Sequence, residues 1–122
     1  MTKEDKELLL KDLCARLPYM TKVRRYRYTT PIDSIQSVEL LGLGWLEELY
    51  GEEAEFKPYL FPLSSMTEEQ SKVYHELING MFGTSALINF EVLTDFFNSN
   101  HLDYRGLIKR GLAIDATGLN IY

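Results

Sequence analysis

The sequence has few of the residues from which metal and catalytic sites are built. Its 122 residues include one cysteine and two histidines. Zinc sites need three or four converging ligands and often contain Cys-x-x-Cys or His-x-x-x-His pairs, and neither pair occurs here. His101 and Asp103 stand two residues apart and would still lack two ligands. Gly42 and Gly44 are not followed by the third glycine and the lysine of a phosphate loop. We therefore expect no metal, no cofactor and no enzymatic activity.

The single cysteine and the lack of long apolar runs also bear on the compartment. One cysteine cannot form an internal disulfide, and small secreted domains usually contain several. The chain begins with acids among its first residues instead of a basic and then apolar signal pattern. Its longest uncharged apolar stretch, residues 84–90, is too short to cross a bilayer. These observations predict a cytoplasmic protein without membrane contact.

The bulk composition is that of an ordinary globular protein. Hydrophobic residues make up 45% of the chain and charged residues 25%, which is typical of a folded domain. The length fits one domain, residues 1–122. A net charge of −5 argues against non-specific binding to nucleic acid or to anionic membranes.

Apolar residues at helical spacing predict a first helix, which begins at a Thr2–Asp5 capping box and ends before Pro18. Its expected buried face comprises Leu9, Leu10, Leu13, Cys14 and Leu17. Cys14 is therefore expected to be a small buried hydrophobic residue and not a nucleophile. Asp12 and Arg16 belong to the charged face that we expect to be in solvent.

The middle of the chain favours strands. β-Branched and aromatic residues dominate residues 20–41 and predict two strands joined near Pro31. Residues 45–50 fit either a third strand or a helical turn. Residues 54–59 alternate as a strand does, and Pro58 should restrict that strand to a sheet edge or to a short length.

The C-terminal half favours helices. A capping box, Thr67 with Gln70, predicts a helix that ends near residues 79–80. A second helix is predicted over residues 89–100, a third over residues 104–110 capped by Asp103, and a closing strand over residues 112–114. The predicted fold class is α+β: a small antiparallel sheet of three to five strands packed against three or four helices, mostly from the C-terminal half.

Three blocks of the sequence resemble a known family. They are LLKDLCARLPY at residues 9–19, KPYLFPLSSMT at residues 57–67, and DYRGLI with GLA at residues 103–108 and 111–113. In combination they resemble a family of short uncharacterised proteins from Bacteroides-type gut bacteria and their phages or prophages. The blocks cover about a quarter of the chain. The resemblance implies a bacterial or phage-related setting and supplies no catalytic or binding residue.

One stretch between these blocks has the composition of a binding surface. Residues 21–32 contain four cations and no acid, and residues 33–56 contain seven acids and no cation. Cations interleaved with aromatic residues can bind phosphates and stack bases, but strand alternation sends Arg24 and Arg25 to opposite faces. Ion pairing with the following acids, an acidic protein partner and nucleic acid all remain open. The candidate partner-binding residues are Arg24, Arg25, Tyr26, Arg27 and Tyr28.

The sequence thus predicts a small non-catalytic binding or accessory protein of a phage or mobile-element setting, which acts through protein–protein contacts. The alternative is a nucleic-acid-binding regulator that uses Lys22 to Tyr28. An enzyme of unrecognised type is the least favoured hypothesis, because no pair of titratable groups with complementary roles is evident.

Overall fold

The computed structural model describes residues 1–28, 30, 32–42, 44–80 and 86–122, and it has the predicted α+β fold. Its four strands are β1 (Lys22–Arg27), β2 (Ile32–Ser37), β3 (Ala54–Leu60) and β4 (Ile114–Asp115), in the sheet order β2-β1-β3-β4. β1 is antiparallel to both β2 and β3, whereas β4 pairs with β3 in parallel. The sheet is therefore mixed and not wholly antiparallel. The predicted turn residue Pro31 lies outside the described residues.

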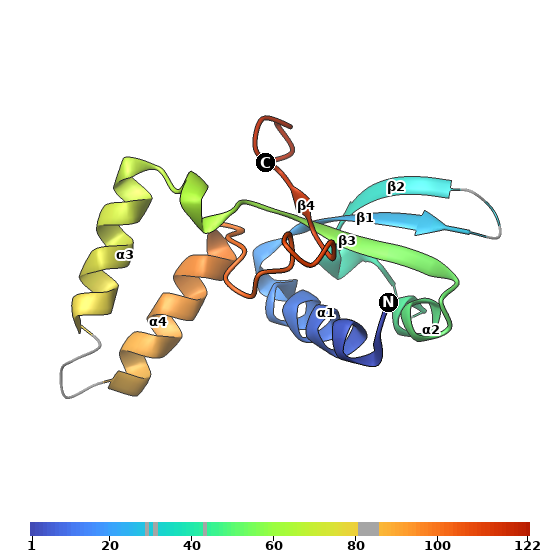
Figure 1. The fold of residues 1–122 in the computed structure, drawn as a ribbon, viewed down its shortest axis with the longest axis horizontal. Coiled ribbons are helices and arrows are strands. Elements are labelled where there is room, and N and C mark those ends of the chain that lie inside the picture. Colours follow the sequence, from blue (N-terminus) through green and yellow to red (C-terminus); the bar gives the residue numbers. More distant parts are fainter. Residues whose placement is uncertain (29, 31, 43, 81–85) are drawn as a thin grey trace.

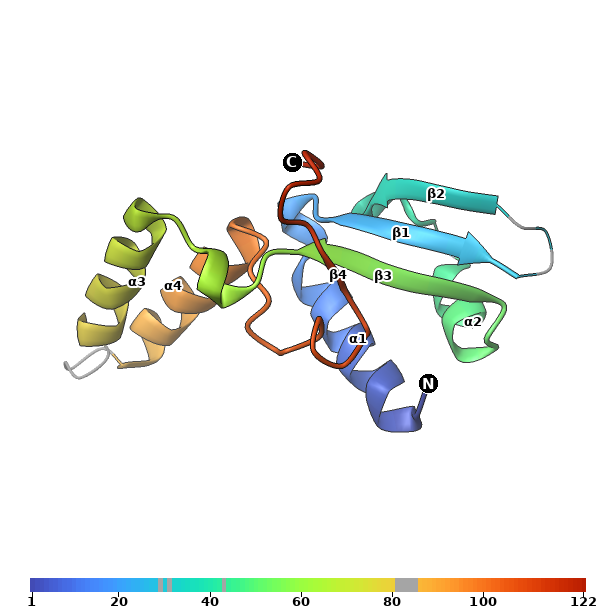
Figure 2. The ribbon, with the colours of Figure 1, turned by 45° about the horizontal axis from the view of Figure 1, so that its top comes forward.

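Two helices from the N-terminal half cover one face of the sheet. They are α1 (Lys3–Ala15) and α2 (Trp45–Tyr50) (Figures 1 and 2). The helices α3 (Glu68–Gly80) and α4 (Ala86–Ser99) form a hairpin beyond the end of the sheet (Figure 1). The prediction that C-terminal helices cover the sheet is wrong, because the apolar side chains of the hairpin pack on each other and on neighbouring loops.

Both predicted capping boxes are present. The Thr2 hydroxyl accepts a hydrogen bond from the Asp5 amide at 3.1 Å, and the Asp5 carboxylate accepts one from the Thr2 amide at 3.1 Å. Thr67 and Gln70 make the same reciprocal pair at 3.1 and 2.9 Å. Each box satisfies backbone donors that a helix start would otherwise leave without partners, so both helices begin where the sequence indicates.

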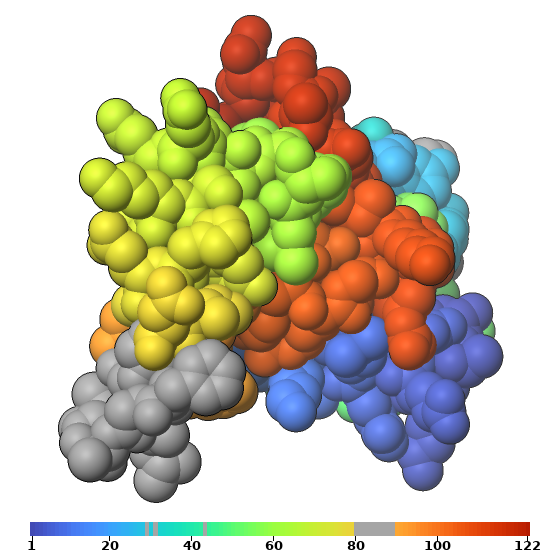
Figure 3. Space-filling model, turned by 60° about the vertical axis from the view of Figure 1, so that its left-hand side comes forward, coloured from blue at the N-terminus to red at the C-terminus, as the bar shows by residue number. Residues whose placement is uncertain are grey.

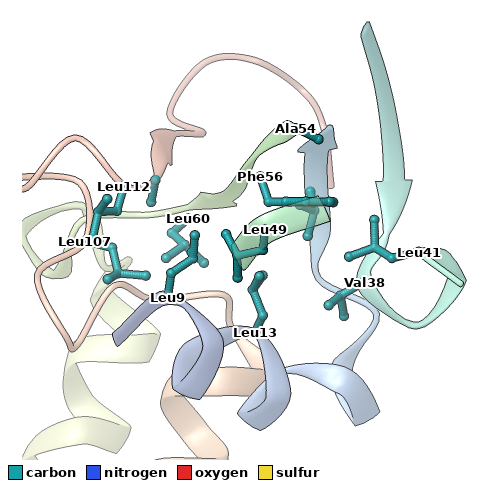
Figure 4. Packing of buried hydrophobic residues seen from close by; sticks show 12 residues of the cluster. Leu9, Leu13, Val38, Leu41, Leu49, Ala54, Phe56, Leu60, Leu107 and Leu112 are labelled. Carbon is teal, nitrogen blue, oxygen red and sulfur yellow. The ribbon is translucent and has the colours of Figure 1, made fainter. Parts of the chain in front are cut away.

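The main core lies between α1, α2 and the sheet. Leu9 and Leu13 project from α1 towards Leu60 and Phe56 of β3 and Leu49 of α2 (Figure 4). All five side chains are almost completely buried. Burial of several such residues removes enough apolar area from water to be the main favourable contribution to folding.

A second apolar cluster joins the helical hairpin to the rest of the molecule. Leu93 and Phe97 of α4 pack with Leu102, which follows that helix, and Phe97 stacks on Tyr104 with ring centroids 5.0 Å apart. The segment after α4 lies between α3 and α1 on the surface seen from the hairpin side (Figure 3). The hairpin is thus held to the body through its C-terminal end.

The buried face of α1 differs from the predicted one. Leu9 and Leu13 are buried as expected, but Cys14 and Leu17 are exposed. Asp12 and Arg16, predicted to face solvent, are both 0% exposed. The helix is therefore rotated so that a charged pair enters the interior, where each charge needs a partner.

Three other expectations are corrected or refined. β3 is an inner strand and not the sheet edge expected from Pro58. On the side of β4, however, only Tyr59 and Leu60 of β3 are paired, so Pro58 lies before the paired residues. Residues 104–110 form turns and not a helix, and the Asp103 carboxylate closes this loop by accepting from the amides of Leu107 and Ile108. Residues 45–50, left open between strand and helix, are helical.

Among the described residues, no helix is long and apolar enough to span a bilayer.

Candidate functional site

The arginine-rich segment forms β1, and its side chains alternate between the two sheet faces. Arg24 and Tyr26 lie on the face away from the helices, where Arg24 donates from Nε and Nη2 to the two carboxylate oxygens of Asp33, each at 3.0 Å. Asp33 is on the neighbouring strand β2. The arrangement is a bidentate Arg–carboxylate ion pair, which fixes the orientation of the guanidinium plane.

Arg25 and Arg27 lie on the opposite face and share one carboxylate of α2. Arg25 donates to Oε2 of Glu48 from Nε at 2.9 Å and also from Nη2, and its Nη1 donates to the Leu41 carbonyl at 3.1 Å. The Arg27 Nη2 lies 3.1 Å from Oε1 of Glu48. Arg25 is buried, whereas the side chain of Arg27 is 40% exposed.

These contacts confirm the internal ion pairing that the charge pattern offers. Both acceptor carboxylates, Asp33 and Glu48, belong to the acidic stretch that follows β1, and the strand alternation divides Arg24 from Arg25 as expected. Of the candidate partner-binding residues, Arg25 is buried and fully engaged, Tyr26 is half-buried, and Arg27 and Tyr28 are accessible. The candidate surface is therefore smaller than the five residues predicted from the sequence.

The accessible part of this region continues onto β2, the outermost strand. Ile32 and Ile35 of β2 are 52% and 51% exposed, and Tyr28 at the end of β1 is 52% exposed. The Asp33 carboxylate forms an ion pair with Arg24. Sequence analysis did not single out the two isoleucines because it could not tell which predicted strand would be outermost.

A hollow lies under β2 on the helix-side face of the sheet. It has a volume of about 160 Å³ and is lined by Arg25, Arg27, Ile32, Ser34 and Gln36. Two of the residues that line the hollow each have a buried polar atom without a hydrogen-bond partner: Nε of Arg27 and Oε1 of Gln36. Because a buried polar group without a partner is costly, a rearrangement of either side chain that gave this atom a polar partner would be favourable.

A second polar constellation is largely inside the protein, between α1 and the segment after α4. Arg16 donates from Nε to Oδ2 of Asp12 at 2.8 Å and from Nη2 to the Leu102 carbonyl at 2.7 Å. Arg105 donates from Nη1 to Oδ1 of Asp12 at 2.9 Å. The Arg16 and Arg105 guanidinium carbons lie 5.4 and 4.5 Å from the centre of the Tyr104 ring. Both Asp12 oxygens are thus occupied by arginines.

His101 and Tyr122 form a stacked pair next to this network. Their ring centroids are 3.9 Å apart, and His101 Nδ1 lies 3.1 Å from the Thr21 hydroxyl. The Tyr122 hydroxyl donates to the Tyr59 carbonyl at 2.6 Å and accepts from the Lys22 amide at 2.8 Å. Burial, with a smaller effect from the Arg16 charge, lowers the pKa of His101 to about 4. Burial raises the pKa of Tyr122 above its ordinary value.

The lowered pKa of His101 predicts a loss of stability in mild acid. Between pH 6.5 and about 4 the unfolded chain protonates this ring and the folded chain does not, so the free energy of unfolding should fall as the pH decreases through this range. In His101→Asn that decrease should be smaller than in the wild type. Asparagine suits the left-handed backbone of residue 101, where φ is 55°.

Denaturant unfolding at several pH values would measure this difference. The matched control is His75→Asn, because His75 is exposed on α3, and this variant should keep the wild-type slope. An unchanged slope in His101→Asn would show that the ring titrates alike in both states.

The described residues contain no group of three or more His, Cys, Asp or Glu side chains placed to hold a metal ion. Comparison with protein-family models, with curated proteins and with solved structures finds no match for this chain. The candidate functional features of the described residues are therefore the hollow next to β2, the Asp12 network and the outer edge of β2.

Proposed function

We propose that the protein is a small non-catalytic binding protein that acts through protein–protein contacts at the β2 edge. The observation that carries the proposal is the exposure of Ile32 and Ile35 on the outermost strand β2, each about half exposed, next to the similarly exposed Tyr28 and the accessible cation Arg27. Aromatic and apolar side chains together with arginine are characteristic of protein interfaces. An outermost strand also offers unpaired backbone groups to a partner.

The charge arrangement supports a protein partner more than nucleic acid. Arg24 and Arg25 are held by carboxylates on opposite faces of the sheet, so they do not form one positive surface. Glu55 and Asp33 lie directly opposite Tyr26 on the neighbouring strands, so carboxylates balance the positive charge on that face. Few phosphate contacts would also leave binding weak and sensitive to salt. The phage or mobile-element setting of this function stays a prediction from the family resemblance.

The test compares the wild type with Ile35→Asp in affinity capture from the native host, followed by mass spectrometry. We expect a protein that is recovered with the wild type to be lost with Ile35→Asp. The matched control is Val73→Asp, which changes an apolar residue of similar exposure on α3 and should retain the partner. Circular dichroism would verify that both variants are folded.

A parallel measurement tests the nucleic-acid alternative. Fluorescence anisotropy with labelled single- and double-stranded DNA and RNA at about 50 mM salt, where phosphate contacts are strong, should show no micromolar binding. Micromolar binding that weakens in a folded Arg24→Ala/Arg27→Ala variant would make the regulator the better proposal. Equal partner recovery by the wild type and Ile35→Asp would contradict contact through the β2 edge.

A further inference from the structure

We infer that the β2 edge binds an extended acidic polypeptide segment, and that a carboxylate side chain of this segment enters the hollow lined by Arg25, Arg27, Ile32, Ser34 and Gln36. This inference rests on the proposed function and names the chemistry of the partner. The segment would pair with β2 through its backbone. Its specificity would come from the side chain directed at the hollow.

The position of β2 at the edge of the sheet allows its backbone to pair with a further strand. β2 is the outermost strand, and β1 pairs with it along all six residues, from Lys22 opposite Ser37 to Arg27 opposite Ile32. The other side of β2 can therefore accept one more strand. Edge strands are commonly protected by charged residues or proline, but the one charged residue of β2, Asp33, is neutralised by Arg24. Nothing in the side chains of β2 repels a strand.

Side-chain alternation then defines which ligand residue meets the hollow. Ile32, Ser34 and Gln36 all line it and occupy every second position of β2, so they lie on one face of the sheet. In an added strand, every second side chain would lie on that same face, next to this row. A volume of about 160 Å³ is well below that of ordinary small-molecule pockets and suits one side chain.

The charges around the hollow favour a carboxylate there. Two guanidinium groups, of Arg25 and Arg27, share the single carboxylate of Glu48, which leaves one positive charge in excess. The Nε of Arg27 is a buried donor without a partner, and the Gln36 amide has a buried oxygen without one. A carboxylate would accept from Arg27 and balance the excess charge. Hydrogen bonds between charged groups are the strongest of those available to it.

The test is an NMR titration of the ¹⁵N-labelled full chain with a blocked peptide, Thr-Val-Glu-Val-Thr. We expect shifts of the β2 amides and of the Arg27 Nε signal. The same peptide with glutamine in place of glutamate should bind about tenfold more weakly, because it loses the charge-assisted contact. Arg27→Gln should weaken binding of the glutamate peptide by a similar factor.

The double change Arg24→Gln/Asp33→Asn is the matched control, because it removes a similar ion pair on the other face of the sheet and leaves no carboxylate on β2 without a partner. It should change the affinity less than twofold. Equal binding of the glutamate and glutamine peptides would overturn the inference. So would shifts of the β2 amides that depend only on the concentration of the protein itself, since these would show that a second copy occupies the edge.

The two proposals fail differently. A host partner that is lost with Ile35→Asp but kept with Arg27→Gln would overturn the acidic segment and leave the proposed function in place. A host partner that is retained by both variants would contradict both proposals.

Discussion

Asp12→Ala is expected to lower the free energy of unfolding by about 3–5 kcal/mol, because removal of one partner from a buried ion pair leaves the other charge uncompensated. Arg16 is 0% exposed and loses its only carboxylate in this variant. Arg105 also loses a partner, but its side chain is 15% exposed and has some access to water. Most of the cost therefore arises at Arg16.

Denaturant unfolding, followed by circular dichroism, measures this effect. Asp33→Ala is the matched control, since it breaks an Arg–Asp pair whose side chains are 35% and 51% exposed. Exposed pairs contribute about 0–1 kcal/mol, so the control should remain close to the wild type. A similar loss in both variants would mean that the Asp12 pair is accessible to water in solution.

Leu13→Ala is expected to cost about 2–5 kcal/mol, as is usual for large-to-small changes in a well-packed core. Leu13 is 0% exposed and packs from α1 into the cluster that includes Phe56 and Leu60. The change should reduce the denaturation midpoint without a change of slope, because the surface exposed on unfolding stays nearly the same.

Leu17→Ala provides the comparison, because Leu17 lies directly after the same helix and is exposed. Its loss should be well below that of Leu13→Ala. A loss of less than about 0.5 kcal/mol for Leu13→Ala, within the range of ordinary surface substitutions, would place Leu13 outside the core.

Local signals in the sequence predicted where two of the helices begin and which segments form strands. The two capping boxes place the starts of α1 and α3 correctly, since the residues that satisfy the helix ends are close neighbours in the chain. The strands β1 and β2 follow from β-branched and aromatic composition, and β3 follows from the alternation of its residues. Internal pairing of the arginines was one of three alternatives that the sequence left open, and the acids that follow them in the chain supply the partners.

The rotation of α1 could not be predicted in this way. Residues 9, 13 and 16 form one helical stripe and residues 10, 14 and 17 form the next, and the second is the more apolar of the two. The first stripe is buried because Leu102 and Arg105 supply partners for Arg16 and Asp12. These partners lie 86 and 93 residues away, so no local pattern reveals them.

The sequence also did not reveal that the candidate site lies at the edge of the sheet. Strand composition indicates that β2 exists, but the order of strands in a sheet depends on tertiary pairing. The exposure of Ile32 and Ile35, and the hollow next to Ile32, follow from that order. Asp103 shows a related limit, because its carboxylate accepts amides four and five residues ahead and closes a loop where a helix start was expected.

The Tyr122 hydroxyl, which joins the Lys22 amide to the Tyr59 carbonyl, has a consequence for the order of events during synthesis on the ribosome. The β1–β2 hairpin and β3 can pair once residue 60 has left the exit tunnel. The bond from Lys22, in contrast, has to wait for a residue 100 positions later. Asp12 waits for Arg105 in the same way. Since contacts between distant positions form late and slowly, the nascent chain holds a sheet without β4 and an Asp12 without its Arg105 partner until these later residues emerge.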